Sequence, residues 1–274
     1  MITFSLVSGG TSVAALFMAG YIPGALWALA CMLVVYIYAK KAGYRSQTKL
    51  TGKEKFNAFI QALPCLLLII IVIGGIIAGV FTATEGSVVA VVYSLLLSIY
   101  GYKSMKWKDL PEIFRASAEM TGIIIFLIGV SSIMSWVMAF TNIPTMVSNG
   151  LLSISSNKYV ILLMINIILL VVGTFMDMTP ATLIFTPIFL PVCTALGMNT
   201  IHFGIMLIFN LCIGTITPPV GTTLFVGVKV GGVKIETVFK HLLPYFFAII
   251  VVLMLVTYIP QLSLWLPGLM GYVS

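Results

Sequence analysis

The sequence predicts an all-α membrane protein, a polytopic helical bundle that contains a re-entrant hairpin and an unwound helix. Apolar residues occupy 61% of the 274 positions and charged residues only 8%, against about 45–50% and about 25% in soluble domains. The mean hydropathy is +1.18. Long apolar runs without amphipathic periodicity recur along the chain, and glycine, threonine and proline interrupt two of them. Such a chain belongs in a lipid bilayer.

The apolar runs are predicted to form helices surrounded by lipid or by protein. They are residues 14–39, 63–81, 88–100, 123–140, 159–172, 181–196, 205–213 and 242–259. Several are shorter than the roughly 20 residues that cross a bilayer. This shortness favours segments that enter the membrane without crossing it.

The positive charges follow the membrane topology. The net charge is +7, and ten of the fourteen Lys and Arg residues fall in two loops. They are Lys40, Lys41, Arg45, Lys49, Lys53 and Lys55 in the first loop, and Lys103, Lys106, Lys108 and Arg115 in the second. Loops rich in Lys and Arg stay on the cytoplasmic side, so both loops are predicted to be cytoplasmic. The basic residues therefore indicate topology, and no nucleic-acid partner is expected.

An amphipathic segment follows each basic loop. Residues 51–63 begin with Thr51 and Glu54 at capping-box spacing, and residues 110–120 carry Pro111 near a helix start. Both segments gather apolar side chains on one side, so we expect them to lie on the cytoplasmic surface. They are either linker helices between parts that move relative to one another or passive interfacial anchors.

The first interrupted element is "GTFMDMTP", residues 173–180. Gly173 can end one helix. Asp177 or Thr179 can cap the next helix, with Pro180 at its first position.

The second interrupted element is "GTITPPVG", residues 214–221, between apolar arms at 204–213 and 222–228. Ten helical residues cover about 15 Å, which carries an arm only to the middle of the bilayer. Non-helical backbone at that depth is tolerated where it is buried in protein or lines a wet cavity. Opened carbonyls favour a hard cation such as sodium and helix N-termini favour anions, so the two breaks predict both sites side by side. The alternative is a pair of proline-kinked packing helices.

Particular residues suit such a site. Gly173 and Gly214 allow two backbones to approach closely, and Thr217 adds a hydroxyl. Pro218 and Pro219 keep nearby carbonyls from being captured by a continuing helix.

A few polar side chains lie in or beside the apolar segments. Glu85 follows Thr82 at capping-box spacing, which favours a role in holding that turn. A charged side chain such as that of Asp177 is energetically costly inside a membrane. Asp177 either caps a helix or has a functional role, in which it contacts substrate, coordinates an ion through water or carries a proton. Asn210 and Asn142 are weaker substrate-binding candidates, for which packing hydrogen bonds are the alternative.

Other chemistries lack the residues that they need. The cysteines Cys31, Cys65, Cys193 and Cys212 have neither CxxC nor Cys/His spacing, so disulfides and zinc are not expected. His202 and His241 lack a metal-ligand spacing and are expected at the membrane interface. No Walker A, HExxH or GxSxG motif is present, so we expect no enzyme and no catalytic residue. The first twelve residues have no basic start or continuous apolar region, so no cleavable signal peptide is expected.

Two distant segments resemble each other. "SGGTSVAALFMAGYIPG" places Gly9 and Gly10 before an apolar helix with Pro23, and "VGGVKIETVFKHLLPY" places Gly231 and Gly232 before one with Pro244. Many secondary transporters are built from internal repeats. If this repeat is real, the chain begins at the tail of a first repeat and is a fragment or a split subunit.

Three motifs together resemble one transporter family. At "GVFTATEGSVVAVVYSLL", "GTFMDMTPATLIFTPIFLPV" and "FGIMLIFNLCIGTITPPVGTTLFV" the chain is similar to the large membrane subunit of tripartite ATP-independent periplasmic (TRAP) transporters, the DctM-like family. The resemblance runs from end to end but covers only the C-terminal part of that subunit. It implies the second half of an inverted-repeat, elevator-type transporter.

The resemblance also implies an activity and partners. It implies an importer of organic acids in the bacterial inner membrane, with sodium as the coupling ion and no other cofactor. A periplasmic substrate-binding protein would feed the importer, and a small four-helix membrane subunit would accompany it. A stand-alone sodium-coupled anion carrier of related fold and a truncated chain without transport of its own are the alternatives.

Site residues follow from the matching positions. The sodium site of the family falls on Gly173, Gly214, Thr217 and Val220, mostly through backbone oxygens. Asp177 matches an acidic residue near the substrate site. Family members that handle sialic acid carry an arginine just before the position of Asn142, where "AFTNIP" has none, so the substrate anion stays open.

The resulting organisation has five stretches. Residues 1–39 form the tail of a first repeat and a transmembrane helix. Residues 40–63 form the cytoplasmic basic loop and the first amphipathic segment, and residues 64–116 form scaffold transmembrane helices and the second amphipathic segment. Residues 117–241 form the transport region with its interrupted elements at 173–180 and 214–221. Residues 242–274 form a C-terminal transmembrane helix and tail.

Overall fold

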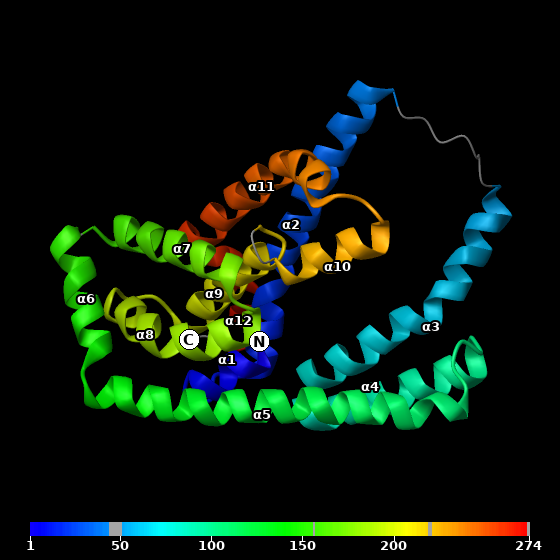
Figure 1. The fold of residues 1–274 in the computed structure, drawn as a ribbon, viewed down its shortest axis with the longest axis horizontal. Coiled ribbons are helices and arrows are strands. Elements are labelled where there is room, and N and C mark those ends of the chain that lie inside the picture. The colour runs from blue at the N-terminus through cyan, green and yellow to red at the C-terminus, as the bar shows by residue number, and fades with distance from the viewer. Residues whose placement is uncertain (44–50, 156, 219–220, 273–274) are drawn as a thin grey trace. The chain divides into compact units, whose positions relative to one another are not determined.

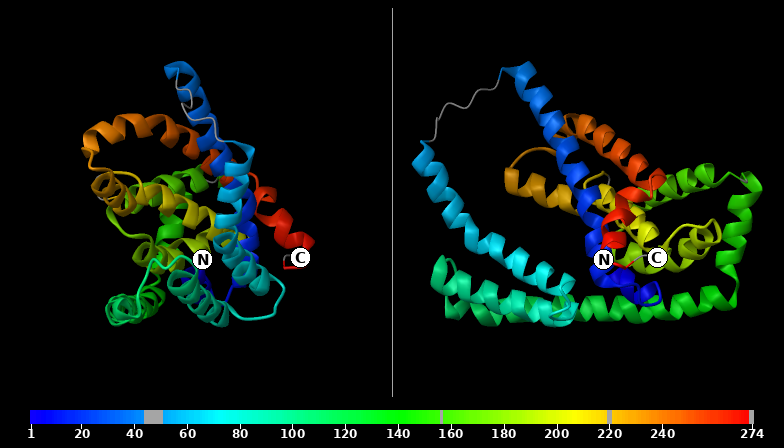
Figure 2. Two further views of the ribbon diagram at one scale, coloured as in Figure 1. Left: turned by 90° about the vertical axis from the view of Figure 1, so that its right-hand side faces the viewer. Right: turned by 180° about the vertical axis from the view of Figure 1, so that it is seen from behind.

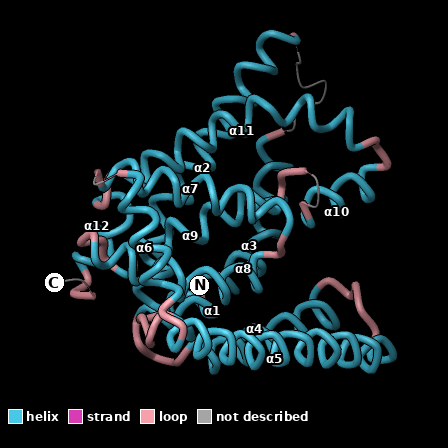
Figure 3. The backbone as a smooth tube through the Cα atoms, turned by 60° about the vertical axis from the view of Figure 1, so that its left-hand side comes forward, coloured by secondary structure: helices cyan, strands magenta, loops and turns pink. Residues whose placement is uncertain are grey.

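The protein is helical throughout the part that the structure describes. The computed structural model describes residues 1–43, 51–155, 157–218 and 221–272, and these ranges contain helices and loops without a strand (Figures 1 and 3). The helices are α1 (Ile2–Val7), α2 (Val13–Ala42), α3 (Gly52–Ile77), α4 (Ala83–Leu96), a π-helical turn (Leu97–Gly101), a 3-10 turn (Trp107–Asp109), α5 (Leu110–Phe140), α6 (Ile143–Ile154), α7 (Lys158–Phe175), α8 (Met178–Ala195), α9 (Thr200–Thr215), α10 (Thr222–Gly231), α11 (Ile235–Tyr258) and α12 (Gln261–Leu269).

Seven helices in the described ranges are long and apolar enough to cross a membrane. They are Val13–Ala42, Gly52–Ile77, Ala83–Gly101, Trp107–Met134, Lys158–Phe175, Met178–Ala195 and Ile235–Tyr258. The predicted all-α membrane class is therefore confirmed. The short helices α6 and α12 were not predicted, because neither follows from a long apolar run.

The chain divides into two compact units. One comprises residues 1–38 and 124–274, and the other comprises residues 39–123. In the second unit α3 packs against α4, and the hydroxyl of Tyr93 donates a hydrogen bond to the Pro64 carbonyl at 2.9 Å. Large apolar side chains such as Ile69 and Ile70 are exposed along α3. Exposing these apolar side chains to water would be unfavourable, whereas exposing them to lipid hydrocarbon is not.

Both predicted capping boxes are present in the second unit. The Glu54 carboxylate accepts from the Thr51 N–H at 2.7 Å, and α3 begins there. At the start of α4 the Glu85 carboxylate accepts from the Thr82 N–H at 2.7 Å, and the Glu85 N–H donates to the Thr82 hydroxyl at 3.3 Å. Glu85 therefore holds its turn, as its spacing predicts.

Both predicted amphipathic segments are helical, and both continue directly into apolar helix. Residues 51–63 lead into the rest of α3 with Pro64 inside the helix, and residues 110–120 form the start of α5. Arg115 and Glu119 form an exposed ion pair at 3.1 Å on α5. Such pairs contribute little to stability, which agrees with a solvated face.

The helix α9 is the centre of the first unit (Figures 1 and 2). Twelve of its 16 residues are buried, and it packs against α7, α8, α11 and α12. The close approach of α1 depends on Gly204, because a Cβ there would lie 2.6 Å from a ring carbon of Phe4. The core of this unit is thus built around one almost fully buried helix.

The arm predicted at residues 204–213 is too short. The helix α9 starts at Thr200, because the Asn199 side chain caps it by accepting from the Ile201 N–H at 2.8 Å. Its 16 residues cover about 24 Å, and α7 and α8, with 18 residues each, cover about 27 Å. The lengths of α7 and α8 therefore do not by themselves require a re-entrant course.

The two segments with similar sequences also have similar local structure. Gly9 and Gly10, with φ of 82° and 89°, separate α1 from α2, and Gly232, with φ of 61°, separates α10 from α11. In both cases a short helix, a glycine turn and a long helix follow one another. The long helices carry Pro23 and Pro244 at comparable places.

Candidate cation and anion site

The first break in the helical pattern lies between α7 and α8. Met176 and Asp177 are in extended backbone conformations, and Asp177 caps α8 by accepting from the Thr179 N–H at 3.5 Å. The cap at Asp177 puts Pro180 at the third position of α8, so its prediction at the first position was wrong. The backbone N–H groups in the first turn of a helix have no acceptor within the helix. A proline in that turn therefore removes no helical hydrogen bond.

The second break lies between α9 and α10. Helical hydrogen bonding ends at Thr215, after which the Thr217 N–H donates to the Gly214 carbonyl at 2.9 Å and the Gly221 N–H to the Thr217 carbonyl at 3.2 Å. In a continuing helix, residue 218 would donate to Gly214, but Pro218 has no N–H. The proline thus explains why the helix tightens and then opens. The breaks fall within the predicted ranges 173–180 and 214–221.

The two breaks meet at a pair of glycines. A Cβ on Gly214 would lie 2.3 Å from the carbonyl carbon of Gly173 and 2.5 Å from its oxygen. A Cβ on Gly173 would lie 3.1 Å from the Cα of Gly214. Gly214 admits no side chain at this backbone contact, and a side chain at Gly173 would fit only if its neighbour shifted by a few tenths of an ångström. The close approach that the sequence predicts for this pair is therefore confirmed.

The helix ends give this contact its electrostatic character. Gly173 lies in the last turn of α7 and Gly214 in the last turn of α9. The C-terminal end of a helix carries about half a negative charge, and two such ends meet here. The N-terminus of α8, which carries the opposite charge, begins three residues after Phe175. The arrangement favours a cation at the glycine contact and an anion beside it.

Thr217 brings a hydroxyl to the second break. Its Oγ1 donates to the Ile213 carbonyl at 2.7 Å. A hydroxyl that donates its proton keeps lone pairs with which to accept or to coordinate. Val220, the fourth residue of the predicted sodium site, lies outside the described residues.

The three predicted substrate residues occupy different environments. Asp177 and Asn142 are exposed, and Asn142 stands at the start of α6 with φ of 56°. Asn210 is fully buried, and its amide nitrogen donates to Asn166 Oδ1 at 2.7 Å and to the Met206 carbonyl at 2.8 Å. Its hydrogen bonds favour the packing alternative.

Sequence reasoning missed the partners of Asn210. Asn166 in α7 donates to the Thr257 hydroxyl in α11 at 3.1 Å, so a buried polar cluster ties α7, α9 and α11 together. The sequence does indicate a buried polar contact here, because Asn166 is an isolated amide in an apolar run. His202, expected at the membrane interface, is buried inside the protein, with 2% of its surface exposed.

The fold defines a polytopic helical membrane protein in which two helix breaks meet at a pair of glycines. Residues 1–262 match the family described as the tripartite ATP-independent periplasmic transporter, DctM component. The chain belongs to this family, whose members are transporter components rather than enzymes.

Several bacterial proteins are similar to the chain. It is 51% identical to the uncharacterized protein YgiK of Salmonella typhimurium, over 98% of this chain and 62% of that protein. It is 37% identical to the sialic acid TRAP transporter large permease protein SiaM of Vibrio cholerae, over 99% of this chain and 64% of that protein. It is 36% identical to the C4-dicarboxylate TRAP transporter large permease protein DctM of Pseudomonas aeruginosa, over 95% of this chain and 61% of that protein. The chain thus spans less than two thirds of the length of these relatives.

Proposed function

We propose that the chain is the C-terminal part of the permease of a sodium-coupled TRAP transporter that imports organic acids across the bacterial inner membrane. The observation that carries this proposal is the backbone contact of Gly173 with Gly214 between two broken elements. Family membership supports the transporter class, and the relatives named for sialic acid and C4-dicarboxylates support an anionic substrate.

The proposed sodium site consists of Gly173, Gly214, Thr217 and Val220. The Gly214 carbonyl accepts from the Thr217 N–H at 2.9 Å and is also approached by the Ile216 N–H, while Pro218 cannot supply the donor of a continuing helix. The Thr217 hydroxyl supplies a further oxygen. Hard cations prefer such neutral oxygen ligands, and the two helix C-termini add attraction for positive charge.

The proposed substrate site lies beside the sodium site. Asp177 is four residues beyond Gly173, so sodium and Asp177 lie along the same short stretch of chain. An organic acid alone would be repelled by this carboxylate, and a bound cation offsets the repulsion. We propose that the exposed Asp177 and Asn142 face the substrate, and that Asn210 supports Gly214 from one helical turn away.

The proposed architecture is one half of an elevator. In it α7 and α8 form a re-entrant hairpin, and α9 and α10 form the unwound helix. The local likeness of α1–α2 to α10–α11 supports an inverted repeat, of which this chain carries the second half, with its transport region at residues 117–241. A periplasmic substrate-binding protein and a small membrane subunit of the Q type are the proposed partners, and the proposed location is the inner membrane.

Uptake into proteoliposomes tests this proposal. The full-length protein is reconstituted with its small subunit, and uptake of C4-dicarboxylate and sialic acid is measured with the cognate binding protein. We expect uptake of an organic acid that requires both a sodium gradient and the binding protein. Uptake that is unchanged when choline replaces sodium would refute the coupling.

The same assay separates the alternatives. Sodium-dependent uptake without any binding protein would favour a stand-alone anion carrier. The absence of uptake in a stably assembled complex would favour a chain without transport of its own.

Two variants of Thr217 test the hydroxyl as a sodium ligand. Thr217→Ser keeps the hydroxyl and should keep the sodium dependence, whereas Thr217→Val keeps the shape and should raise the sodium concentration needed for half-maximal uptake. Thr223→Val, at an exposed site in α10, is the matched control. Equal loss of protein abundance and of sodium response in Thr217→Val would indicate a structural role instead.

A further inference from the structure

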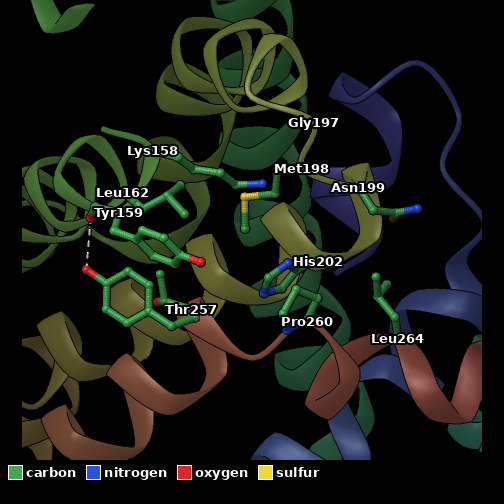
Figure 4. Close-up of a pocket in the computed structure, with 11 residues that line it drawn as sticks. Lys158, Tyr159, Leu162, Gly197, Met198, Asn199, His202, Thr257, Pro260 and Leu264 are labelled. Atoms are coloured by element: carbon green, nitrogen blue, oxygen red, sulfur yellow. Dashed lines mark hydrogen bonds between the residues drawn. The ribbon is translucent and has the colours of Figure 1, made fainter. Parts of the chain in front are cut away.

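A second polar site lies at the opposite end of α7 from the glycine contact. A cavity of about 210 Å³ opens where α7 and α9 begin and α11 ends (Figure 4). Its lining includes Lys158, Tyr159, Met198, His202, Tyr258 and Leu264. Lys158 and Gly173 are 15 residues apart in one helix, which corresponds to about 22 Å. The cavity is therefore separate from the proposed transport site.

One wall of the cavity is the buried ring of His202. Its Nε2 lies 2.8 Å from the Val256 carbonyl. In a helix that carbonyl would accept from residue 260, but Pro260 has no N–H, so the histidine supplies the missing donor. A carbonyl can only accept, so Nε2 carries the proton and the neutral ring presents Nδ1 as an acceptor. No residue in the described part of the chain hydrogen-bonds to Nδ1.

The positive charge in the cavity comes from Lys158. It is the first residue of α7 and is half-buried, and in Figure 4 its ammonium group points into the space beside Met198. Among the described residues, no carboxylate lies within ion-pair distance of it. The side chains of Asn157 and Asn199 already cap the two helix starts, so the ammonium is the main cationic group here. The cavity thus offers a positive charge and a separate acceptor.

Two tyrosines place this end of the bundle at a membrane surface. The rings of Tyr159 and Tyr258 lie 5.7 Å apart, and the Tyr258 hydroxyl donates to the Tyr159 carbonyl at 3.0 Å. Both tyrosines lie at the ends of long apolar helices, where tyrosine is enriched at the level of lipid headgroups. The cavity is also smaller than the roughly 300–1,000 Å³ of sites for drug-sized ligands. Its size suits a headgroup or an anion of a few atoms.

We propose that this cavity binds an anionic group with a neighbouring hydroxyl: the anion pairs with the Lys158 ammonium and the hydroxyl donates to His202 Nδ1. Phosphatidylglycerol in the surrounding membrane and free glycerol phosphate both have this chemistry. The site is independent of sodium coupling, so its failure and that of the proposed function are distinguishable.

The test measures binding to the full-length protein in phosphatidylcholine nanodiscs. The lipid arm compares phosphatidylglycerol with phosphatidylethanol, an anionic lipid without a free hydroxyl, by native mass spectrometry. The soluble arm titrates glycerol phosphate by calorimetry. In whichever arm shows binding, Lys158→Met should weaken the binding about tenfold or more, because a charge-assisted hydrogen bond is lost. Lys158→Arg should keep binding, and Lys234→Met, at an exposed lysine before α11, should not change it.

His202→Gln tests the hydroxyl contact. Glutamine keeps an N–H donor for Val256, but its acceptor oxygen lies at the end of the side chain and not at the position of the ring Nδ1. The preference for phosphatidylglycerol over phosphatidylethanol should therefore fall while the protein stays folded. Binding in the lipid arm alone identifies a lipid site, and binding in the soluble arm alone identifies a site for a free anion. The proposal is overturned if neither probe binds, if Lys158→Met binds as the unchanged protein does, or if His202→Gln leaves the preference intact.

Discussion

The substitution Gly214→Ala tests whether the glycine contact builds the sodium site. The added Cβ would lie 2.3 Å from the Gly173 carbonyl carbon, whereas non-bonded carbons prefer about 3.5–4.0 Å. The two helix ends must therefore separate by more than about 1 Å at the point where the carbonyls converge. Overpacking of this kind costs about 1–3 kcal/mol.

The expected effect is on sodium affinity. If this cost falls on the sodium-bound form, the apparent affinity drops about 5- to 150-fold. Sodium-dependent uptake in proteoliposomes measures the half-saturating concentration, and a thermal melt of the purified protein measures folding. Gly173→Ala should have a milder effect, because its Cβ would lie 3.1 Å from the Gly214 Cα.

A matched control separates this effect from a general intolerance of alanine. Gly227 lies in α10 and a Cβ there would meet no atom within 4 Å. Gly227→Ala should leave sodium affinity unchanged. The reasoning is refuted if Gly214→Ala retains the normal sodium response, or if Gly173→Ala proves more harmful than Gly214→Ala.

Three further predictions concern polar side chains. Asp177→Asn keeps a good helix cap, so uptake should fall while the melting temperature is unchanged; normal uptake would remove Asp177 from the substrate site. Asn166→Leu should destabilise the protein by about 1–3 kcal/mol, because buried partners are left unsatisfied. Adding Asn210→Leu should cost less than the sum of the two single changes, and strict additivity in denaturation would show that the pair does not interact. Glu85→Ala removes the acceptor for the Thr82 N–H and should lower the melting temperature, which an unaltered melt would contradict.

Local features were predictable from the sequence because their causes are local. The capping boxes at Thr51 and Thr82 depend on residues three positions apart, and both formed. The break after Thr215 follows from Pro218, which cannot donate to Gly214. The predicted arm starts four residues after the true start of α9, because Thr200 and His202 are polar and the apolar run begins beyond them. The cap at Asn199 outweighs that polarity.

Long-range features could not be derived from one sequence. Asn166 and Thr257 are 91 residues apart, and nothing in either neighbourhood identifies the other as its partner. The pairing of Gly173 with Gly214 was suggested by two similar breaks and by the family resemblance, whereas its distance required coordinates. The role of His202 depends on a carbonyl left unpaired by Pro260, in a helix that is remote in the sequence.

The glycine contact also limits how the gene can vary. Every missense change of a glycine codon introduces a side chain with a Cβ, and at Gly214 any Cβ would overlap Gly173. In a library of random variants selected for uptake, codon 214 should stay glycine and codon 173 should accept no residue larger than alanine. Codons 150 and 227, where a Cβ would meet nothing nearby, should accept replacements. Tolerance of mutation would then map the glycine contact without any ligand being added.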